Sequence, residues 1–268
     1  MSPRAGRLLL LAILAAAAAA RVVSLLDLRA NDPLFPSRGT YSDGRYYHEW
    51  AAALAQGKEF PPEPSGRPHW MPPLYPYVLS LLYRIAGPHP LSLVLLQHAL
   101  GLAGLLLLHR LARRVFEERA ALLAVALGAF FLPPGFFEGK PMAETLAAFL
   151  ALSGLASLTG TGSRPRAAAG GILVGLASCA RPQLLPALPA VALALARGPS
   201  RPAALPFLAG AVLAPGASLI CNLAVSGQPV LVSANGGVNF HLGNHAGVRG
   251  TFRAPGPQWG SIFEQRRT

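Results

Sequence analysis

The sequence predicts an all-α protein that crosses a membrane several times. Hydrophobic residues make up 52% of its 268 residues and charged residues only 13%, whereas soluble domains carry about 25% charged residues. The apolar residues gather in runs that prolines, glycines and short basic clusters separate. Such runs are typical of helices that satisfy their backbone hydrogen bonds inside a bilayer. The composition therefore excludes an ordinary water-soluble domain.

The charge balance is strongly basic, with a formal net charge of +12 at pH 7. A nucleic-acid-binding domain gathers its basic residues on one face, but here they form dispersed clusters between apolar runs. Signals that orient membrane helices explain this pattern better, so no nucleic-acid partner is expected. The two cysteines, Cys179 and Cys221, lie in apolar segments and are interpreted as small hydrophobic residues, with a thiol function as the alternative.

The first apolar run covers residues 8–28 and follows Arg4 and Arg7. A cleaved signal peptide is one interpretation, since residues 15–20 resemble the small-residue region before a cleavage site. The further apolar runs downstream favour an uncleaved first span with its N-terminus in the cytoplasm. Arg21 then lies near the outer end of this span, where its side chain can reach the interface.

A polar, proline-rich segment follows at residues 29–90, and we expect it to form a long outer loop. Within it, residues 46–56 have the composition of a short helix that Gly57 terminates. Residues 74–86 are apolar but too few to cross a bilayer, which takes about 20 residues. We expect this piece to lie in the interface, with its three tyrosines at the headgroup level: Tyr75, Tyr77 and Tyr83.

The remaining apolar runs predict six more spans, at about residues 91–109, 119–132, 142–159, 167–181, 183–197 and 202–223. The basic clusters at Arg110–Arg119 and Arg164–Arg166 set their orientation, because such clusters remain in the cytoplasm. Residues 167–197 could also form one kinked span, but a hairpin at Arg181 keeps both flanking clusters inside. The predicted fold is therefore a seven-span domain over residues 1–223, with an extracytoplasmic segment at 224–268.

Asp43 is the strongest candidate for chemistry. It lies in the sequence TYSDGRYYHEW, just beyond the first span, beside aromatic residues suited to a sugar. A carboxylate at the membrane interface can act as general base for an acceptor hydroxyl, and Tyr46 and Tyr47 can contact the substrate. The alternative is that Asp43 simply caps the helix that follows it.

Several stretches of the chain resemble the N-terminal half of a GT-C type membrane glycosyltransferase. These are YSDGRYYHEWAAALAQG, PPLYPYVLSLLYRIAG and QHALGLAGLLLLHRLARRVFEERAALLAVALGAFF. They are similar to the bacterial relatives of protein O-mannosyltransferases and of the lipid A aminoarabinose transferase. The resemblance implies a catalytic acid in the first outer loop, which is Asp43, and inversion at the anomeric carbon. Gly44 stands where many members of the superfamily carry a second acid.

The resemblance also implies functional residues in the later outer loops. Glu138 lies in the second loop, where the superfamily often has another functional acid, which could bind a metal or position the acceptor. Lys140 and Arg181 can bind the phosphate of a polyprenyl phosphate sugar donor. The alternative for both cations is anchoring at the interface.

Asparagines and histidines on the outer side supply weaker candidates. Asn239, with Asn235 and Asn244, can hydrogen-bond sugar hydroxyls, and glycine-rich turn formation is the alternative for this stretch. Four histidines have no compact ligand spacing, so no metal site is predicted from them, although a divalent cation is not excluded as cofactor: His48, His69, His241 and His245.

Taken together, the sequence predicts an enzyme of the bacterial inner membrane. We expect it to move a sugar from a polyprenyl phosphate donor to a lipid, glycan or protein acceptor at the outer face, among membrane lipids. A transporter or flippase of a lipid-linked substrate is the first alternative, but acids are nearly absent from the span interiors, which favours a surface site. A non-catalytic fragment is the second, since the sequence stops at Thr268 in what resembles the middle of a domain.

Overall fold

The computed structural model describes residues 2–31, 43–60, 63, 65–159 and 163–244 of the chain. Its regular structure over these residues is helical, which confirms the all-α prediction, and one isolated bridge joins Phe60 and Glu63. The helices are α1 (Pro3–Asn31), α2 (Asp43–Ala55), α3 (Leu74–Ala86), α4 (Pro90–Val115), α5 (Glu118–Phe130), α6 (Leu132–Glu138), α7 (Glu144–Leu158), α8 (Arg164–Ala180), α9 (Ala187–Arg197), α10 (Ala204–Ala211), α11 (Leu213–Ser226) and α12 (Gly236–Asn244).

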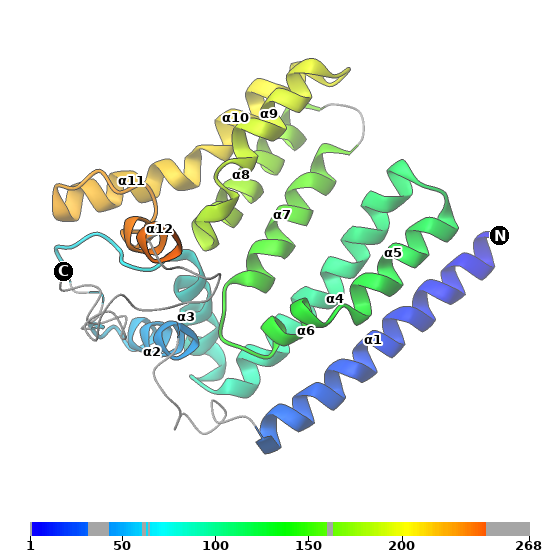
Figure 1. Ribbon diagram of the computed structural model, residues 1–268, viewed down its shortest axis with the longest axis horizontal. Helices are drawn as coiled ribbons and strands as arrows, with labels where there is room; N and C mark the ends of the chain where they lie inside the picture. Colours follow the sequence, from blue (N-terminus) through cyan, green and yellow to red (C-terminus); the bar gives the residue numbers. More distant parts are fainter. Residues whose placement is uncertain (1, 32–42, 61–62, 64, 160–162, 245–268) are drawn as a thin grey trace.

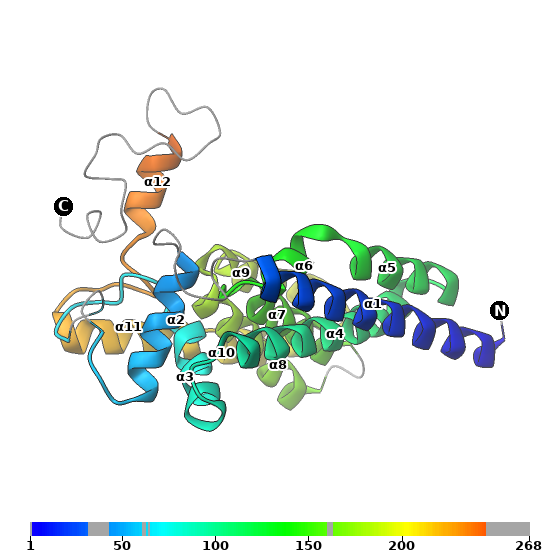
Figure 2. The ribbon, with the colours of Figure 1, turned by 90° about the horizontal axis from the view of Figure 1, so that it is seen from below.

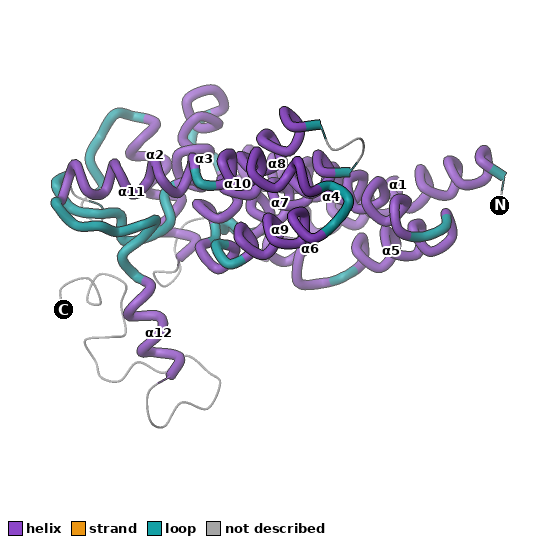
Figure 3. Tube along the Cα trace, turned by 90° about the horizontal axis from the view of Figure 1, so that it is seen from above, coloured by secondary structure: helices purple, strands orange, loops and turns teal. Residues whose placement is uncertain are grey.

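The long helices lie side by side in an elongated bundle (Figure 1). Across it, α1 contacts α5 and α4, α4 contacts α7, α7 contacts α8, and α8 contacts α10. The short helices α2 and α3 pack together at one end of the bundle. Figures 2 and 3 show that α12 projects from this end, away from the bundle. The outer loop predicted from the sequence is therefore a folded cap on one end of the helices.

Three helical stretches among the described residues are long and apolar enough to cross a membrane: α1, α4 and Arg201–Ser226, which includes α10 and α11. The other predicted spans are also helical but shorter, with 13 residues in α5, 15 in α7, 17 in α8 and 11 in α9. A span takes about 20 residues. The structure thus supports a membrane protein with three candidate spans, and the count of seven stays a prediction.

The chain breaks at Arg181, as the hairpin interpretation required. Helix α8 ends at Ala180, a 3₁₀ turn covers Pro182–Leu184, and α9 begins at Ala187. Leu188 of α9 packs in one core with Val174 of α8. Because α9 folds back onto α8, Arg181 lies at the tip of a helical hairpin.

Small residues bring α8 and α10 into backbone contact. A Cβ atom at Gly171 would overlap the carbonyl oxygen of Phe207, and one at Gly210 would overlap the carbonyl oxygen of Ala168. Close approach through glycine is the packing that membrane helices use, because lipid supplies no hydrophobic force between them. This contact holds the α8 hairpin against the rest of the bundle.

The basic clusters and the α2–α3 cap lie at different ends of the molecule (Figure 1). The N-terminus, the turn between α4 and α5 and the first turn of α8 lie on one side, and they contain the clusters that predicted a cytoplasmic location. Helices α2 and α3 lie on the other side. The structure thus separates the basic clusters from the cap, and the cytoplasmic location of the clusters stays a prediction.

The tyrosines of α3 correct one expectation. Tyr75 and Tyr83 are buried in the main hydrophobic core with residues of α2, so they hold the cap together and do not lie at the lipid headgroups. Tyr77 is exposed, and its interfacial position stays a prediction. The reason is the amphipathic spacing of α3, which turns positions 75, 79 and 83 towards α2.

Candidate active site

A pocket of about 500 Å³ opens between the α2–α3 cap and the tip of the α8 hairpin. Four stretches of chain form it: the start of α2, the segment before α3, the turn after α8, and the residues before and within α12. Its lining residues are Asp43, Tyr47, Met71, Pro72, Arg181, Pro182, Gln183, Leu185, Leu231, Val232, Ser233, Asn235, Gly236, Asn239 and Phe240. Five of the predicted site residues therefore meet in one place: Asp43, Tyr47, Arg181, Asn235 and Asn239.

Asp43 is the first residue of α2 and contributes a carboxylate to this pocket. Burial raises the pKa of Asp43 above its ordinary value, and the nearby Arg181 guanidinium lowers it in part. Burial wins because removal of water penalises the charged carboxylate more than the cation stabilises it. A carboxylate with a raised pKa is a stronger base once it is ionised, as general-base catalysis requires.

Gly44 is explained by the packing around it. A Cβ atom at this position would lie 3.0 Å from Cγ of Pro141, closer than carbon atoms normally approach. The first turn of α2 therefore rests directly on the segment between α6 and α7. The second acid that the resemblance led us to look for would not fit at position 44 without moving Pro141.

The two tyrosines after Gly44 have different roles. Tyr47 lines the pocket beside Asp43 and packs edge-on against Tyr75, with ring centroids 5.4 Å apart. Burial, followed by the negative charge of Asp43, raises the pKa of Tyr47 far above its ordinary value, so its hydroxyl stays neutral. Tyr46 is fully buried, and its hydroxyl donates to Oε1 of Glu63 at 2.5 Å. Because Tyr46 does not line the pocket, its position does not support the predicted contact with substrate.

Glu63 organises the wall of the pocket that precedes α3. Its buried carboxylate accepts hydrogen bonds from the backbone N–H groups of Trp70 at 3.0 Å and Met71 at 3.1 Å, in addition to the Tyr46 hydroxyl. These bonds tie α2 to the segment that supplies Met71 and Pro72 to the pocket.

Arg181 forms an ion pair with Glu144, the first residue of α7, at 2.8 Å between Nη2 and Oε1. The other carboxylate oxygen, Oε2, has no hydrogen-bond partner among the described residues. Glu144 is not among the site residues predicted from the sequence. An acidic residue directly before an apolar run is typical of a helix N-terminus, where a carboxylate is stabilised by the helix dipole. This signal could have identified Glu144 at the outer end of a predicted span.

An apolar groove of about 380 Å³ runs between α4, α5 and α7. Leucine, phenylalanine and glycine residues line most of it. Its polar wall residues are Arg21, Glu138, Glu144 and Thr145. Glu144 thus connects two regions, because it lines the groove and holds Arg181 of the Asp43 pocket.

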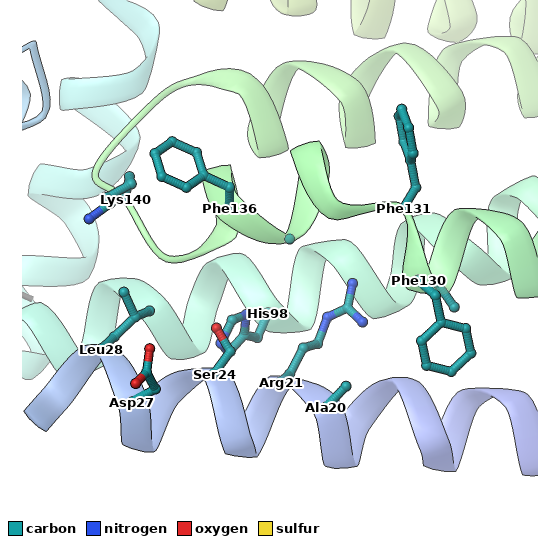
Figure 4. Close-up of a pocket in the computed structure, with 12 residues that line it drawn as sticks. Ala20, Arg21, Ser24, Asp27, Leu28, His98, Phe130, Phe131, Phe136 and Lys140 are labelled. Carbon is teal, nitrogen blue, oxygen red and sulfur yellow. The ribbon is translucent and has the colours of Figure 1, made fainter. Parts of the chain in front are cut away.

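Glu138 and Lys140 lie outside the residues that line the Asp43 pocket. Glu138 is buried, and Arg21 of α1 binds both of its oxygens, at 2.6 and 2.7 Å. Lys140 places its ammonium group 5.6 Å from the ring centre of Phe136 and lines a separate pocket between α1, α5 and α6 (Figure 4). Their positions do not support the predicted contacts with acceptor and donor phosphate.

The segment that ends in α12 is fastened to the cap. Backbone N–H groups of Ala234 and Asn235 donate to the carbonyls of His69 and Trp70, at 2.8 and 3.3 Å. Asn222 of α11 accepts from the N–H of His69 at 3.1 Å. These bonds place Asn235 and Asn239 at the pocket, whereas Asn244 donates to the carbonyl of Phe240 at the end of α12.

The candidate metal ligands stay apart over the described residues, which hold no group of three His, Cys, Asp or Glu side chains. His48 lies 2.6 Å from the Tyr83 hydroxyl, and His69 lies 3.9 Å from Glu63. His245 lies outside the described residues.

The family model described as dolichyl-phosphate-mannose-protein mannosyltransferase matches residues 70–220. No curated protein and no solved structure gives a significant match. The matched region runs from the segment before α3 to α11, and it includes Glu144 and Arg181 but not Asp43. The chain therefore belongs to the dolichyl-phosphate-mannose-protein mannosyltransferase family, whose members are GT-C type membrane glycosyltransferases that use lipid-linked sugar donors.

Proposed function

We propose that the protein transfers a sugar from a polyprenyl phosphate donor to a hydroxyl of a lipid, glycan or protein acceptor. The reaction takes place at the outer face of a bacterial inner membrane, in the Asp43 pocket. One observation carries this proposal: a carboxylate with a raised pKa, Asp43, and a cation, Arg181, line the same pocket.

The two groups match the two charges that the reaction creates. Asp43 takes the proton of the acceptor hydroxyl while the acceptor oxygen bonds to the anomeric carbon. The bond between that carbon and the phosphate oxygen breaks, and the phosphate leaves on its lipid with the bonding electrons. Arg181 stabilises the negative charge that develops on this phosphate.

The position of Arg181 also fits a lipid-linked donor. Glu144 orients the guanidinium by its ion pair and lines the neighbouring apolar groove. A prenyl chain in this groove would bring its phosphate towards Arg181, at the border between the apolar groove and the polar pocket. Tyr47, Asn235 and Asn239 then remain to contact the hydroxyls of the sugar.

The test is a transfer assay with the purified protein in lipid nanodiscs and radiolabelled polyprenyl phosphate sugars. We expect the wild type to transfer label and Asp43→Asn to be slower by about 10²- to 10⁴-fold, the usual contribution of a general base. Asp27→Asn is the matched control, because Asp27 is exposed at the end of α1 and lies outside the residues that line the Asp43 pocket. Wild-type transfer by a correctly inserted Asp43→Asn protein would contradict the proposal.

A further inference from the structure

A second cluster of charged side chains lies inside the helical bundle, away from the Asp43 pocket. Arg21 of α1 donates through Nε to Oε2 of Glu138 at 2.7 Å and through Nη2 to Oε1 at 2.6 Å. Nδ1 of His98 on α4 lies 3.0 Å from the same Oε2. Figure 4 shows the Arg21 side chain extending from α1 towards the segment that carries Phe131 and Phe136. The cluster therefore joins three helices: α1, α4 and α6.

Helix α4 is shaped to accept the Glu138 carboxylate. Gly101 lies one helical turn after His98, on the same face of α4. A Cβ atom at Gly101 would overlap Oε1 of Glu138. Because only glycine leaves room there, the carboxylate rests directly on the α4 backbone.

Both oxygens of Glu138 are occupied by these contacts. Its side chain is almost fully buried, and Arg21 supplies the charge that compensates it. An ionised carboxylate among apolar helices is stable only with such partners. Arg21 and His98 hold the Glu138 carboxylate against α4, and this placement argues against a role in the chemical step.

The segment after Glu138 leads directly to the active site. Nε2 of Gln97 donates to the carbonyls of Glu138 at 3.0 Å and Lys140 at 2.5 Å. Pro141 then packs against Gly44, next to Asp43. Glu144, at the end of the same segment, holds Arg181. Residues 138–144 thus contact Gly44, the neighbour of the general base, and Arg181, the phosphate-binding cation.

We infer that Glu138 is a positioning residue, which sets the spacing between Asp43 and Arg181 by anchoring residues 138–144 to Arg21 of α1. This inference rests on the proposed function for its effect on catalysis. The anchoring itself is a property of the fold and can be measured without sugar transfer.

A double-mutant cycle separates positioning from chemistry. Glu138→Met leaves the Arg21 charge buried without a partner, and we expect kcat to fall about 10-fold or more, since misplaced catalytic groups cost up to about 100-fold. The KM for the donor stays within about twofold, because Arg181 is unchanged and an apolar methionine takes the place of Glu138 in the wall of the groove. In the double variant Arg21→Met with Glu138→Met, two packed thioethers replace the ion pair, an exchange that proteins tolerate, so most of kcat returns.

Arg110→Met is the matched control for the Arg21→Met change in the double variant, because Arg110 is exposed near the C-terminal end of α4. We expect it to retain wild-type kcat. A double variant as inactive as Glu138→Met would overturn the inference, because a residue that takes part in the chemistry cannot be rescued by removing its partner.

Hydrogen–deuterium exchange measures the anchoring of residues 138–144 without requiring sugar transfer. We expect Glu138→Met to increase exchange at residues 138–144 and in the first turn of α2 by about 10-fold, and the double variant to restore protection. Unchanged exchange in Glu138→Met would overturn the inference even if activity were lost. If the wild type transferred no sugar, the proposed function would fail, while the exchange experiment would still decide the anchoring.

Discussion

Two arginine–glutamate pairs lie near the same end of the molecule, and they differ in exposure. The side chains of Arg21 and Glu138 are 11% and 3% exposed, and both carboxylate oxygens have partners. Those of Arg181 and Glu144 are 34% and 18% exposed, and one carboxylate oxygen has no partner among the described residues. The buried pair stabilises the contact between its helices, whereas the half-exposed pair can exchange its partner for a substrate anion.

Substitution of the two arginines tests this difference most strongly. We expect Arg181→Ala to lower kcat by about 100-fold or more with little change in melting temperature, because it removes a charge that stabilises the leaving phosphate. Arg21→Ala leaves Glu138 buried and unpaired, and the free energy of unfolding falls by about 3–5 kcal/mol. Steady-state kinetics and thermal unfolding in the same detergent check both. Equal loss of stability in the two variants would contradict the comparison.

Substitution of the two glutamates should change activity and stability less than substitution of the two arginines. We expect Glu144→Gln to lower kcat by about 10-fold, because the Arg181 guanidinium loses the ion pair that orients it. A charge-assisted hydrogen bond is about twice as strong as the neutral one that glutamine could form. The melting temperature should remain that of the wild type. Glu138→Gln is the matched comparison and should lower the melting temperature. A lower melting temperature for Glu144→Gln together with a wild-type melting temperature for Glu138→Gln would contradict the roles assigned to the two pairs.

The fit of Glu138 against α4 gives a prediction that concerns stability alone. Gly101→Ala puts a methyl group into the space of the carboxylate and should cost about 1–3 kcal/mol. Gly216→Ala in α11 is the control, since a Cβ atom there meets no atom within 4 Å. Chemical or thermal unfolding of both variants provides the measurement, and equal stability would mean that α4 is not packed against Glu138.

The pH dependence of transfer is the smallest expected effect. Asp43 must be ionised to act as base, so activity should rise with pH through a pKa above the ordinary carboxyl value. The Arg181 charge lowers this pKa, and therefore the residual activity of Arg181→Ala should rise at a higher pH than that of the wild type. Arg110→Met should not move the profile. A shift to lower pH in Arg181→Ala would contradict the assigned contact.

The sign of the linkage to stability follows from the same shift. Because the folded protein holds the Asp43 proton more tightly than the unfolded chain, ionisation of Asp43 lowers the stability of the fold. This loss is absent below the ordinary carboxyl pKa and grows as the pH rises through the raised value. Asp43→Asn should therefore reduce the decrease in stability over this pH range, which unfolding at several pH values can measure.

Part of the site could be predicted from the sequence because its residues follow recognisable patterns. Asp43 comes after the first apolar run among aromatic residues, and Arg181 interrupts an apolar stretch between two basic clusters. Orientation by positive charge placed both on one side, and the structure brings both to one pocket. Tyr47 and Asn239 reached the same pocket because they belong to the same two outer segments.

The rest depended on contacts between residues far apart in the chain. Glu138 resembled a functional acid because nothing in the sequence shows that Arg21, 117 positions earlier, compensates its charge. Glu144 resembled the start of an ordinary span, and only the fold brings it to Arg181. Tyr46 and Tyr47 are neighbours, but a helix turns adjacent side chains about 100° apart, so one faces Glu63 and the other faces the pocket.

A single-turnover experiment with Asp43→Asn tests the central claim most directly. The variant is loaded with labelled polyprenyl phosphate sugar, and donor binding is measured separately from product formation after acceptor is added. We predict that the donor binds within about threefold of the wild type, because Arg181 and the groove are intact, while the transfer rate falls by at least about 100-fold. Transfer at the wild-type rate from bound donor would show that another group takes the acceptor proton, and would contradict the assignment of Asp43.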